Sequence, residues 1–182
     1  AATEALPLIG QSILVTGGTG SFGQAFVRRL LSFGGAVAPQ RIAIYSRDEV
    51  KQAALREEFG PDGPRLFLGD VRDPARLALA MRGVATVIHA AALKRVEAGT
   101  YSPSELIATN IQGTINVVNA AISASVSRVI FISSDKCTNA TNLYGATKFC
   151  AEIYAVQANA YGYPAGTHIA AVRYGNVLGS RG

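Results

Sequence analysis

The regular alternation of short apolar runs with longer segments of helical periodicity constrains the fold of this chain more than any other feature. Runs rich in β-branched residues predict strands at 12–16, 41–45, 65–69, 84–89, 128–133 and 168–173. The segments between them predict helices at 22–33, 49–59, 74–82, 103–125 and 144–161. A strand–helix series of this kind forms a parallel sheet covered by helices on both faces. Because the strands are also apolar throughout, we expect an α/β, doubly wound fold with six strands.

Length and composition fit one domain spanning residues 1–182. Of the 182 residues, 49% are hydrophobic and 16% are charged, which supplies a core and excludes intrinsic disorder for the bulk of the chain. No apolar run approaches the ~20 residues of a membrane span, and residues 1–11 lack the basic and apolar regions of a secretory signal. The two cysteines lack zinc or redox spacing, so we expect a soluble, cytoplasmic protein with no metal site.

The charge distribution argues against nucleic acid as a partner. Seventeen Lys and Arg residues against twelve Asp and Glu give a net charge of +5, but the positive residues are scattered along the chain. Their densest group is only Arg28-Arg29, whereas nucleic-acid-binding proteins concentrate basic residues on one element. A phosphorylated small ligand explains the modest basic excess equally well.

A glycine-rich turn directly follows the first predicted strand. Gly17, Gly20 and Gly23 are spaced three residues apart, and a predicted helix begins within the turn. Glycines allow the tight turn and let a pyrophosphate reach the backbone amides at the positive end of the helix. The placement makes this a dinucleotide signature of the Rossmann fold, although an ordinary strand–helix turn is the alternative. The expected contacts here are Gly17, Thr19, Gly20, Ser21, Phe22 and Gly23.

The residues after the second predicted strand favour NADP over NAD. NAD-binding folds commonly carry an acidic residue there to hold the ribose 2′-hydroxyl, but this chain has Ser46-Arg47. A hydroxyl and a guanidinium suit a 2′-phosphate, and Lys51 follows closely. The alternative is that Arg47 is a solvated residue and Asp48 holds the ribose of NAD.

Further cofactor contacts are expected where the third and fourth strands end. Asp70 and Val71 follow the third strand, where they could meet the adenine, but Asp70 could equally cap the helix that begins near Pro74. Small residues that allow close approach of the cofactor follow the fourth strand at Ala90, Ala91 and Ala92. We expect His89, on the buried strand before them, to be a core residue rather than a catalytic one.

Two clusters carry the expected chemistry. Tyr144 and Lys148 are four residues apart near the start of a predicted helix, which places both side chains on one helical face. A neighbouring ammonium favours the phenolate and brings proton transfer by tyrosine within range of neutral pH. The second cluster follows the fifth strand and supplies a hydroxyl, a carboxyl and an amine from Ser134, Asp135 and Lys136.

Together these motifs resemble the extended short-chain dehydrogenase/reductases. The resemblance covers residues 13–182 and is closest to the polysaccharide-biosynthesis branch of nucleotide-sugar 4,6-dehydratases that act on UDP-N-acetylglucosamine. Sugar epimerases of the same superfamily usually have hydroxyl residues where this chain has Asp135-Lys136, so that pair discriminates between the two activities. The most specific segments are Thr-Gly-Gly-Thr-Gly-Ser-Phe-Gly (16–23), Tyr-Ser-Arg-Asp-Glu (45–49), Gly-Asp-Val-Arg-Asp (69–73), His-Ala-Ala-Ala-Leu-Lys (89–94), Ser-Asp-Lys (134–136) and Arg-Tyr-Gly-Asn-Val (173–177).

The resemblance implies a role for each catalytic residue. Tyr144, assisted by Lys148, would take the proton of the sugar 4-hydroxyl as NADP accepts the hydride from carbon 4. Lys136 would then remove the proton on carbon 5, and Asp135 would protonate the departing 6-hydroxyl. Ser134 would orient the 4-hydroxyl. A lysine beside the aspartate is similar to the branch that inverts carbon 5, where the retaining branch has glutamate.

The resemblance also implies partners beyond the cofactor. Lys94, Asn176 and Arg181 would contact the UDP-sugar, and Val177 would lie near the nicotinamide. The family associates through helices that flank the sheet, so we expect a homo-oligomer formed through segments 103–125 and 144–161. The family continues with a smaller C-terminal substrate domain that is absent from these 182 residues, and without it the UDP group would have few walls to bind against.

Three alternatives stay open at this point. A UDP-sugar 4-epimerase would need Tyr144 and Lys148 but has no role for Lys136. A regulatory module that binds NADP without catalysis would use the same fold, because a fold alone proves no activity. Asp135 and Lys136 could also be an exposed ion pair worth at most ~1 kcal/mol.

Overall fold

The computed structural model describes residues 8–33, 38–95, 101–162 and 165–177 and contains one sheet of six parallel strands. The strand order is β3-β2-β1-β4-β5-β6, so the order in which strands join the sheet reverses between β1 and β4, as in the Rossmann fold. The predicted fold class is therefore confirmed. The strands are β1 (Ser12–Thr16), β2 (Arg41–Ser46), β3 (Arg65–Leu68), β4 (Thr86–His89), β5 (Arg128–Ser134) and β6 (His168–Tyr174).

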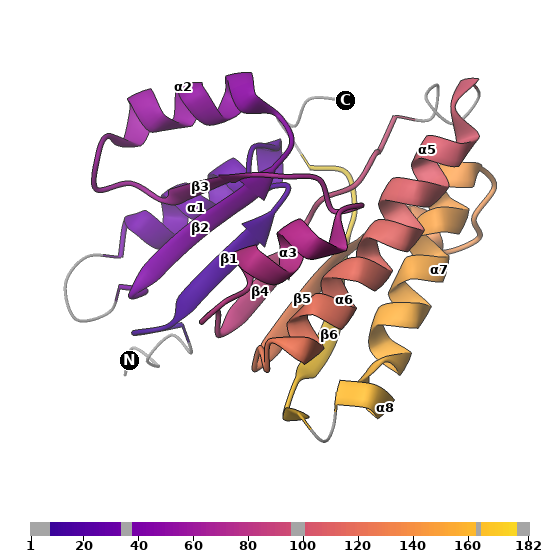
Figure 1. The fold of residues 1–182 in the computed structure, drawn as a ribbon. Helices are drawn as coiled ribbons and strands as arrows, with labels where there is room; N and C mark the ends of the chain where they lie inside the picture. The colour runs from indigo at the N-terminus through magenta and orange to yellow at the C-terminus, as the bar shows by residue number, and fades with distance from the viewer. Residues whose placement is uncertain (1–7, 34–37, 96–100, 163–164, 178–182) are drawn as a thin grey trace, which may run out of the picture.

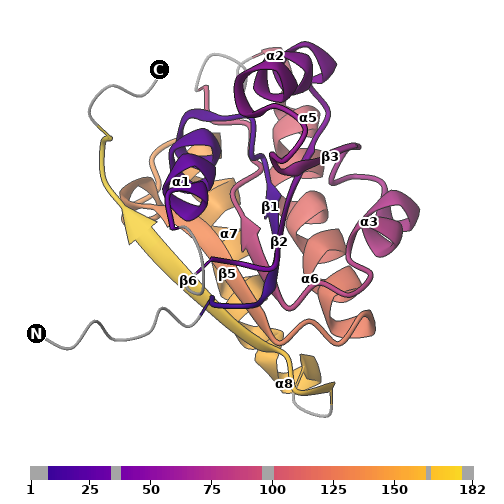
Figure 2. The ribbon, with the colours of Figure 1, turned by 90° about the vertical axis from the view of Figure 1, so that its left-hand side faces the viewer.

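Two helical layers cover the sheet. Helices α1 (Ser21–Leu31) and α2 (Glu49–Phe59) lie against one face. Helices α3 (Pro74–Ala80), α6 (Gly113–Ser123) and α7 (Leu143–Gln157) lie against the other. Figure 1 shows this order along the chain, and Figure 2 shows the sheet between α1 on one side and α3 and α6 on the other.

The central strand explains why both layers are needed. Ile13, Leu14 and Val15 of β1 are all 0% exposed. Because side chains alternate along a strand, Leu14 packs into the core under α3, α6 and α7, whereas Ile13 and Val15 pack under α1 and α2. The uniformly apolar composition of the strand thus reflects burial on both faces, as the sequence predicted.

The predicted helix over 103–125 is interrupted in the structure. It consists of α5 (Pro103–Ile107), a π-helical turn η2 (Ala108–Gln112) and α6. Within the turn, the Asn110 side chain accepts a hydrogen bond from Leu93 N at 2.8 Å and donates to Leu93 O at 3.0 Å. Its amide also donates to Thr147 Oγ1 at 3.0 Å. These long-range bonds accompany a helical distortion that periodicity cannot reveal.

The predicted helix over 144–161 is also divided, into α7 and a short α8 (Asn159–Gly162). The Asn159 side chain donates to Ile169 O and accepts from Ile169 N, both at 2.8 Å, so it pairs with β6 as a strand residue would.

Among the described residues, none of the helices combines the length and the apolar composition needed to cross a bilayer.

A matched pair of truncations tests the layered core. Leu14→Ala should lower the free energy of unfolding by about 2–5 kcal/mol, because it leaves a cavity at a fully buried position. Val50→Ala removes apolar atoms from a helix residue that is 80% exposed and should change it by less than about 0.5 kcal/mol. Urea denaturation followed by circular dichroism measures both, and equal effects would contradict the burial described here.

Candidate active site

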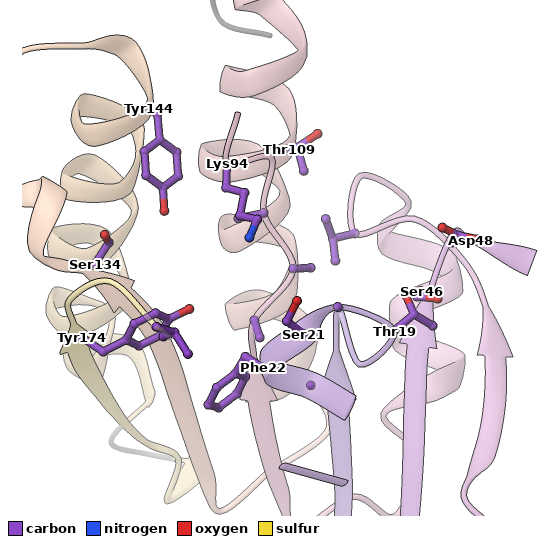
Figure 3. Close-up of a pocket in the computed structure, with 18 of the residues that line it drawn as sticks. Thr19, Ser21, Phe22, Ser46, Asp48, Lys94, Thr109, Ser134, Tyr144 and Tyr174 are labelled. Carbon is purple, nitrogen blue, oxygen red and sulfur yellow. The ribbon is translucent and has the colours of Figure 1, made fainter. Parts of the chain in front are cut away.

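A cleft with a volume of about 810 Å³ opens where the strands end at their carboxyl termini. Figure 3 places Ser134 and Tyr144 at one end of it, Ser46 and Asp48 at the other, and Ser21 between them. This is the edge at which doubly wound folds bind ligands. Of the predicted site residues, Arg181 lies outside the described residues and Lys148 does not line the cleft. All the others line it: Gly17, Thr19, Gly20, Ser21, Phe22, Gly23, Ser46, Arg47, Lys51, Asp70, Val71, Ala90, Ala91, Ala92, Lys94, Ser134, Asp135, Lys136, Tyr144, Asn176 and Val177.

Close backbone packing explains the glycines of the first turn. Gly17 has a φ of +69°, and a Cβ there would lie 2.7 Å from the backbone of Ala91. A Cβ on Gly23 would lie 2.5 Å from the Cα of Gly18. Any side chain at these positions would therefore force the turn away from β4 or away from the start of α1.

The amino end of α1 is available to an anion. The N-cap residue of this helix is Gly20, which makes no side-chain capping bond, and the first turn holds no acidic residue. By contrast, side chains cap three other helices, with Asp48 on α2, Asp73 on α3 and Asn142 on α7. An uncapped amino end lined by backbone amides is suited to bind phosphate.

The acidic residues at the end of the cleft near Ser46 are engaged in ion pairs. Asp48 accepts from Lys51 N at 3.0 Å and pairs with the Lys51 ammonium, whose hydrogen bond holds the pKa of Asp48 below its usual range. Burial raises the pKa of Asp70, but hydrogen bonds from Arg72, with a 2.7 Å ion pair, outweigh this and keep it low. Arg47 makes a longer contact of 3.5 Å with Asp70.

Of the two roles that the sequence left open for Asp70, that of helix cap is wrong. Asp73 caps α3 by accepting from Arg76 N at 2.9 Å. Asp70 lies in the cleft instead, where its carboxylate pairs with Arg72. His89 is 1% exposed and is absent from the residues that line the cleft, in keeping with a core position.

Tyr144 lies in the first turn of α7, which the Asn142 side chain caps by accepting from Gly145 N at 2.9 Å. Burial raises the pKa of Tyr144 above its ordinary value of 10, and the neighbouring Ser134 hydroxyl partly offsets this increase. The phenol is therefore protonated at neutral pH in the structure.

Lys148, the residue expected to assist Tyr144, is buried and binds the backbone of β5. The Lys148 ammonium donates to Ile132 O at 2.6 Å and lies 4.1 Å from the centre of the Phe131 ring. Burial lowers its pKa to about 8. Both side chains belong to one helix at the predicted spacing, and in the structure the ammonium binds the β5 backbone.

Asp135 and Lys136 form a 2.9 Å ion pair at the cleft. The pair lies on the short 3₁₀ turn η3 (Asp135–Cys137) after β5, and both side chains are about half exposed. The hydrogen bond from Lys136 lowers the pKa of Asp135. Lys136 Nζ also donates to Asn176 Oδ1 at 3.4 Å, which joins this turn to the segment after β6.

A second ion pair fixes the elements around that turn. Arg173 of β6 donates from Nε and Nη2 to the Glu152 carboxylate of α7 at distances of 2.7–3.0 Å. Its Nη1 donates to Thr138 Oγ1 at 3.4 Å, just beyond η3. The two charges therefore tie α7, β6 and the loop that carries Asp135 into one arrangement.

Sequence reasoning missed several residues that line the cleft. Tyr174 stacks on Phe22 with ring centres 6.1 Å apart and planes inclined by 14°, so the end of β6 contacts the first turn of α1. The segment 173–177 was already prominent in the sequence and could have indicated Tyr174. Thr109 lies on η2, whose existence the sequence did not signal. The other missed residues are Ala25, Tyr45, Gly69, Asn142 and Gly175, whereas Asp48, named above only as an alternative contact, also lines the cleft.

Comparison with known proteins places this arrangement in a family. A family model described as "Polysaccharide biosynthesis protein" matches residues 13–182. The chain belongs to this family.

Two relatives are similar to the chain over nearly its whole length. The chain is 47% identical over 173 residues to the "UDP-N-acetylglucosamine 4,6-dehydratase (inverting)" of Campylobacter jejuni serotype O:23/36, covering 95% of this chain and 51% of the relative. It is 40% identical over 174 residues to the "UDP-glucose 4-epimerase" of Rickettsia conorii, covering 96% of this chain and 51% of the relative. The chain thus spans about half the length of these relatives.

A solved structure supports the same fold. The dTDP-glucose 4,6-dehydratase DesIV from Streptomyces venezuelae, solved with NAD and TYD bound, aligns with a TM-score of 0.74 at 28% identity. The alignment covers 89% of this chain and 55% of DesIV.

The Arg173–Glu152 pair makes stability depend on pH in a stated direction. Its hydrogen bonds lower the pKa of Glu152 from 4.5, so the stabilisation is complete above that value and disappears as pH falls through the lower folded-state pKa. Glu152→Gln should lower the free energy of unfolding by about 1 kcal/mol at pH 7. The difference from the unmodified chain should shrink as the pH falls below 4.5.

Urea denaturation at a series of pH values measures this difference. Glu57→Gln, which changes an exposed glutamate of α2, serves as the control and should have little effect at any pH. A deficit in Glu152→Gln that stays constant from pH 7 to pH 3 would contradict the electrostatic account.

Proposed function

We propose that this chain is the dinucleotide-binding domain of an NADP-dependent UDP-N-acetylglucosamine 4,6-dehydratase that inverts carbon 5 and serves surface polysaccharide or glycan biosynthesis. The observation that carries the proposal is the Asp135–Lys136 pair, an acid and a base in contact at the cleft that also holds the glycine turn and Tyr144. The 47% identity to a dehydratase of this kind over nearly the whole chain supports it.

The cleft suits a nicotinamide dinucleotide. The uncapped start of α1 would bind the pyrophosphate, and the close packing of Gly17 on Ala91 leaves backbone rather than side chains at its surface. When bound, the dinucleotide supplies a reversible hydride acceptor for the sugar. The remaining chemistry is acid–base and belongs to the side chains of the chain.

The ion pairs near Ser46 favour NADP. Asp48 is engaged as the cap of α2 and as the partner of Lys51, so it is poorly placed to hold a ribose 2′-hydroxyl. Arg47 is half exposed at the cleft, and its 3.5 Å contact to Asp70 is the weaker of the two that this carboxylate makes with arginines. A 2′-phosphate would recruit Arg47 and leave Asp70 satisfied by Arg72.

Tyr144 is proposed to take the proton of the 4-hydroxyl, with Ser134 orienting that hydroxyl. Because burial raises the pKa of Tyr144, the phenol needs a positive charge to act as a base. Lys148, one turn further along α7 with a pKa lowered to about 8, is the residue proposed to supply it, once its ammonium turns from the Ile132 carbonyl.

The Asp135–Lys136 pair is proposed to perform the elimination. One proton passing from Lys136 Nζ to Asp135 Oδ2, 2.9 Å away, gives the amine base and the carboxylic acid that the reaction requires. The amine then takes the proton on carbon 5, which the 4-ketone has made acidic, and the acid protonates the 6-hydroxyl, which leaves as water. Afterwards Lys136 is again an ammonium and Asp135 a carboxylate, so the ion pair is restored.

A UDP-sugar 4-epimerase is the second candidate, favoured by the 40% identity to the Rickettsia conorii epimerase. It would need the same cleft, Tyr144 and Ser134. It would give no task to Lys136, which could then remain an exposed ion pair.

We propose further that the protein acts as a cytoplasmic homo-oligomer. Phe149, Ile153 and Val156 are each exposed and follow one another at helical spacing along α7, which gives this helix an apolar stripe that a second copy could cover. The free thiols of Cys137 and Cys150 suit a reducing compartment.

Arg47 should decide between the two dinucleotides. Arg47→Ala should weaken NADP binding about 10- to 100-fold, because a charge-assisted bond to the 2′-phosphate is lost, and should change NAD binding less than about twofold. Arg56→Ala, an exposed arginine of α2 outside the cleft lining, is the control. Isothermal titration measures both cofactors, and equal losses for NADP and NAD would contradict the assignment.

Lys136 should decide between elimination and epimerisation. Incubation of UDP-N-acetylglucosamine and NADP with the chain, and with the longest protein its gene encodes, should release one water from the sugar, measured by mass spectrometry. Lys136→Met should abolish this loss while retaining NADP affinity, because it removes the base and keeps the side-chain length. An isomer of unchanged mass, formed equally by the unmodified protein and by Lys136→Met, would establish the epimerase instead.

A further inference from the structure

His89 is a buried imidazole that the proposed chemistry does not use. It ends β4, is 1% exposed and has a polar partner on each ring nitrogen. Nδ1 lies 2.7 Å from Thr16 Oγ1 at the end of β1, and Nε2 lies 3.0 Å from Thr114 Oγ1 on α6. The ring therefore bridges the central strand pair and the helix on one face of the sheet.

The partners determine where the ring carries its proton. The single hydroxyl proton of Thr114 is donated to Asn110 O at 2.7 Å, so Thr114 Oγ1 can only accept from the imidazole. Nε2 consequently carries hydrogen. Burial, followed by the charge of Lys148, lowers the pKa of His89 to about 3, so the ring is neutral and Nδ1 accepts from the Thr16 hydroxyl.

One end of this chain of hydrogen bonds reaches the glycine turn. Thr16 Oγ1 also accepts from Ala91 N at 3.4 Å, and Thr16 immediately precedes Gly17. The ring thus helps to set Ala91 against Gly17, the pair whose backbones approach too closely to admit a Cβ.

The other end reaches the π-helical turn. Asn110, whose carbonyl accepts from Thr114, holds the backbone of Leu93 through both groups of its side-chain amide. Leu93 precedes Lys94, which lines the cleft. The loop after β4 is consequently anchored at Ala91 through Thr16 and at Leu93 through Asn110, with His89 between the two anchors.

We propose that His89, in its neutral Nε2–H form, is a positioning residue that sets the loop after β4 against the glycine turn and thereby the geometry of the dinucleotide site. This inference rests on the proposed dinucleotide function of the cleft. The tilted contact of the ring with Phe131, at 5.5 Å between centres, extends the same packing to the ring that lies under the Lys148 ammonium. A charged imidazole here would oppose that ammonium.

Two amide variants separate the hydrogen bond to Thr16 from the hydrogen bond to Thr114. The amide oxygen in His89→Asn can replace Nδ1 as acceptor toward Thr16, whereas the amide NH₂ in His89→Gln can replace Nε2 as donor toward Thr114. His89→Asn should keep NADP affinity within about threefold of the unmodified chain, and His89→Gln should lose about tenfold, the factor that corresponds to one hydrogen bond. The reverse order, or equal losses, would overturn the proposal.

Threonine variants give a matched control for folding. Thr16→Val removes the hydroxyl next to the glycine turn, while Thr86→Val removes an equally buried hydroxyl, bonded to Gln11 Oε1 at 2.7 Å, at the opposite end of β4. Both should lower the melting temperature, but only Thr16→Val should weaken NADP binding about tenfold, and Thr16→Ser should restore it. Equal NADP affinity in the two valine variants would contradict the proposed role.

The ring itself can be observed without any substitution at position 89. The chain has two histidines, so ¹⁵N spectra of the unmodified chain and of His168→Gln assign both rings. His89 should show a protonated Nε2 and a bare Nδ1, unchanged between pH 5 and pH 8. A Nδ1–H form, or titration in this range, would overturn the proposed positioning role. If the unmodified chain bound no dinucleotide, the proposed function would fail and with it the positioning role, whereas the tautomer would still be decided by the spectra.

Discussion

Burial of a parallel sheet on both faces is the constraint from which the site follows. Because the strands are parallel and helices cover both faces of the central ones, the chain must return to the same edge after each strand, and the carboxyl ends of the strands collect at one side. Segments that are far apart in sequence, such as the glycine turn at 17–23 and the Ser-Asp-Lys turn at 134–136, thereby line one cleft. The reversal between β1 and β4 leaves room there for an extended ligand.

Charges in this cleft occur mainly as pairs whose members are already satisfied. Asp48 pairs with Lys51, Asp70 with Arg72, and Asp135 with Lys136. Two of these arrangements are structural, because Asp48 caps a helix and Asp70 bonds to the backbone of its own turn. The third lies on a short turn, bonded to Asn176, and is the pair proposed to exchange a proton during catalysis.

The sequence predicted the parts of this structure that depend on local pattern. The six strands follow from apolar runs, and the glycine turn follows from spacing and context, so most of the cleft lining could be named in advance. The predicted helix at 49–59 agrees with α2 at both ends, because Asp48 and Gly60 flank it as typical start and stop residues.

The remaining features depend on tertiary contacts that no local pattern encodes. The interruption at η2 accompanies bonds between Asn110 and residues seventeen and thirty-seven positions away. Asp70 was the cap expected from the sequence for the helix that begins near Pro74, but the fold gives this role to Asp73. Similarly, i,i+4 spacing places Lys148 on the same helical face as Tyr144, but the carbonyl of Ile132 determines where its ammonium binds.

The protein that contains this cleft is proposed to remove hydrogen from carbon 4 of a sugar and deliver it to carbon 6 while water leaves. The most direct test uses UDP-N-acetylglucosamine carrying deuterium at carbon 4, with the longest protein that contains this chain and NMR analysis of the product. The account predicts deuterium at carbon 6 of a 4-keto sugar. Deuterium that remains at carbon 4 in an isomer of the substrate would contradict it.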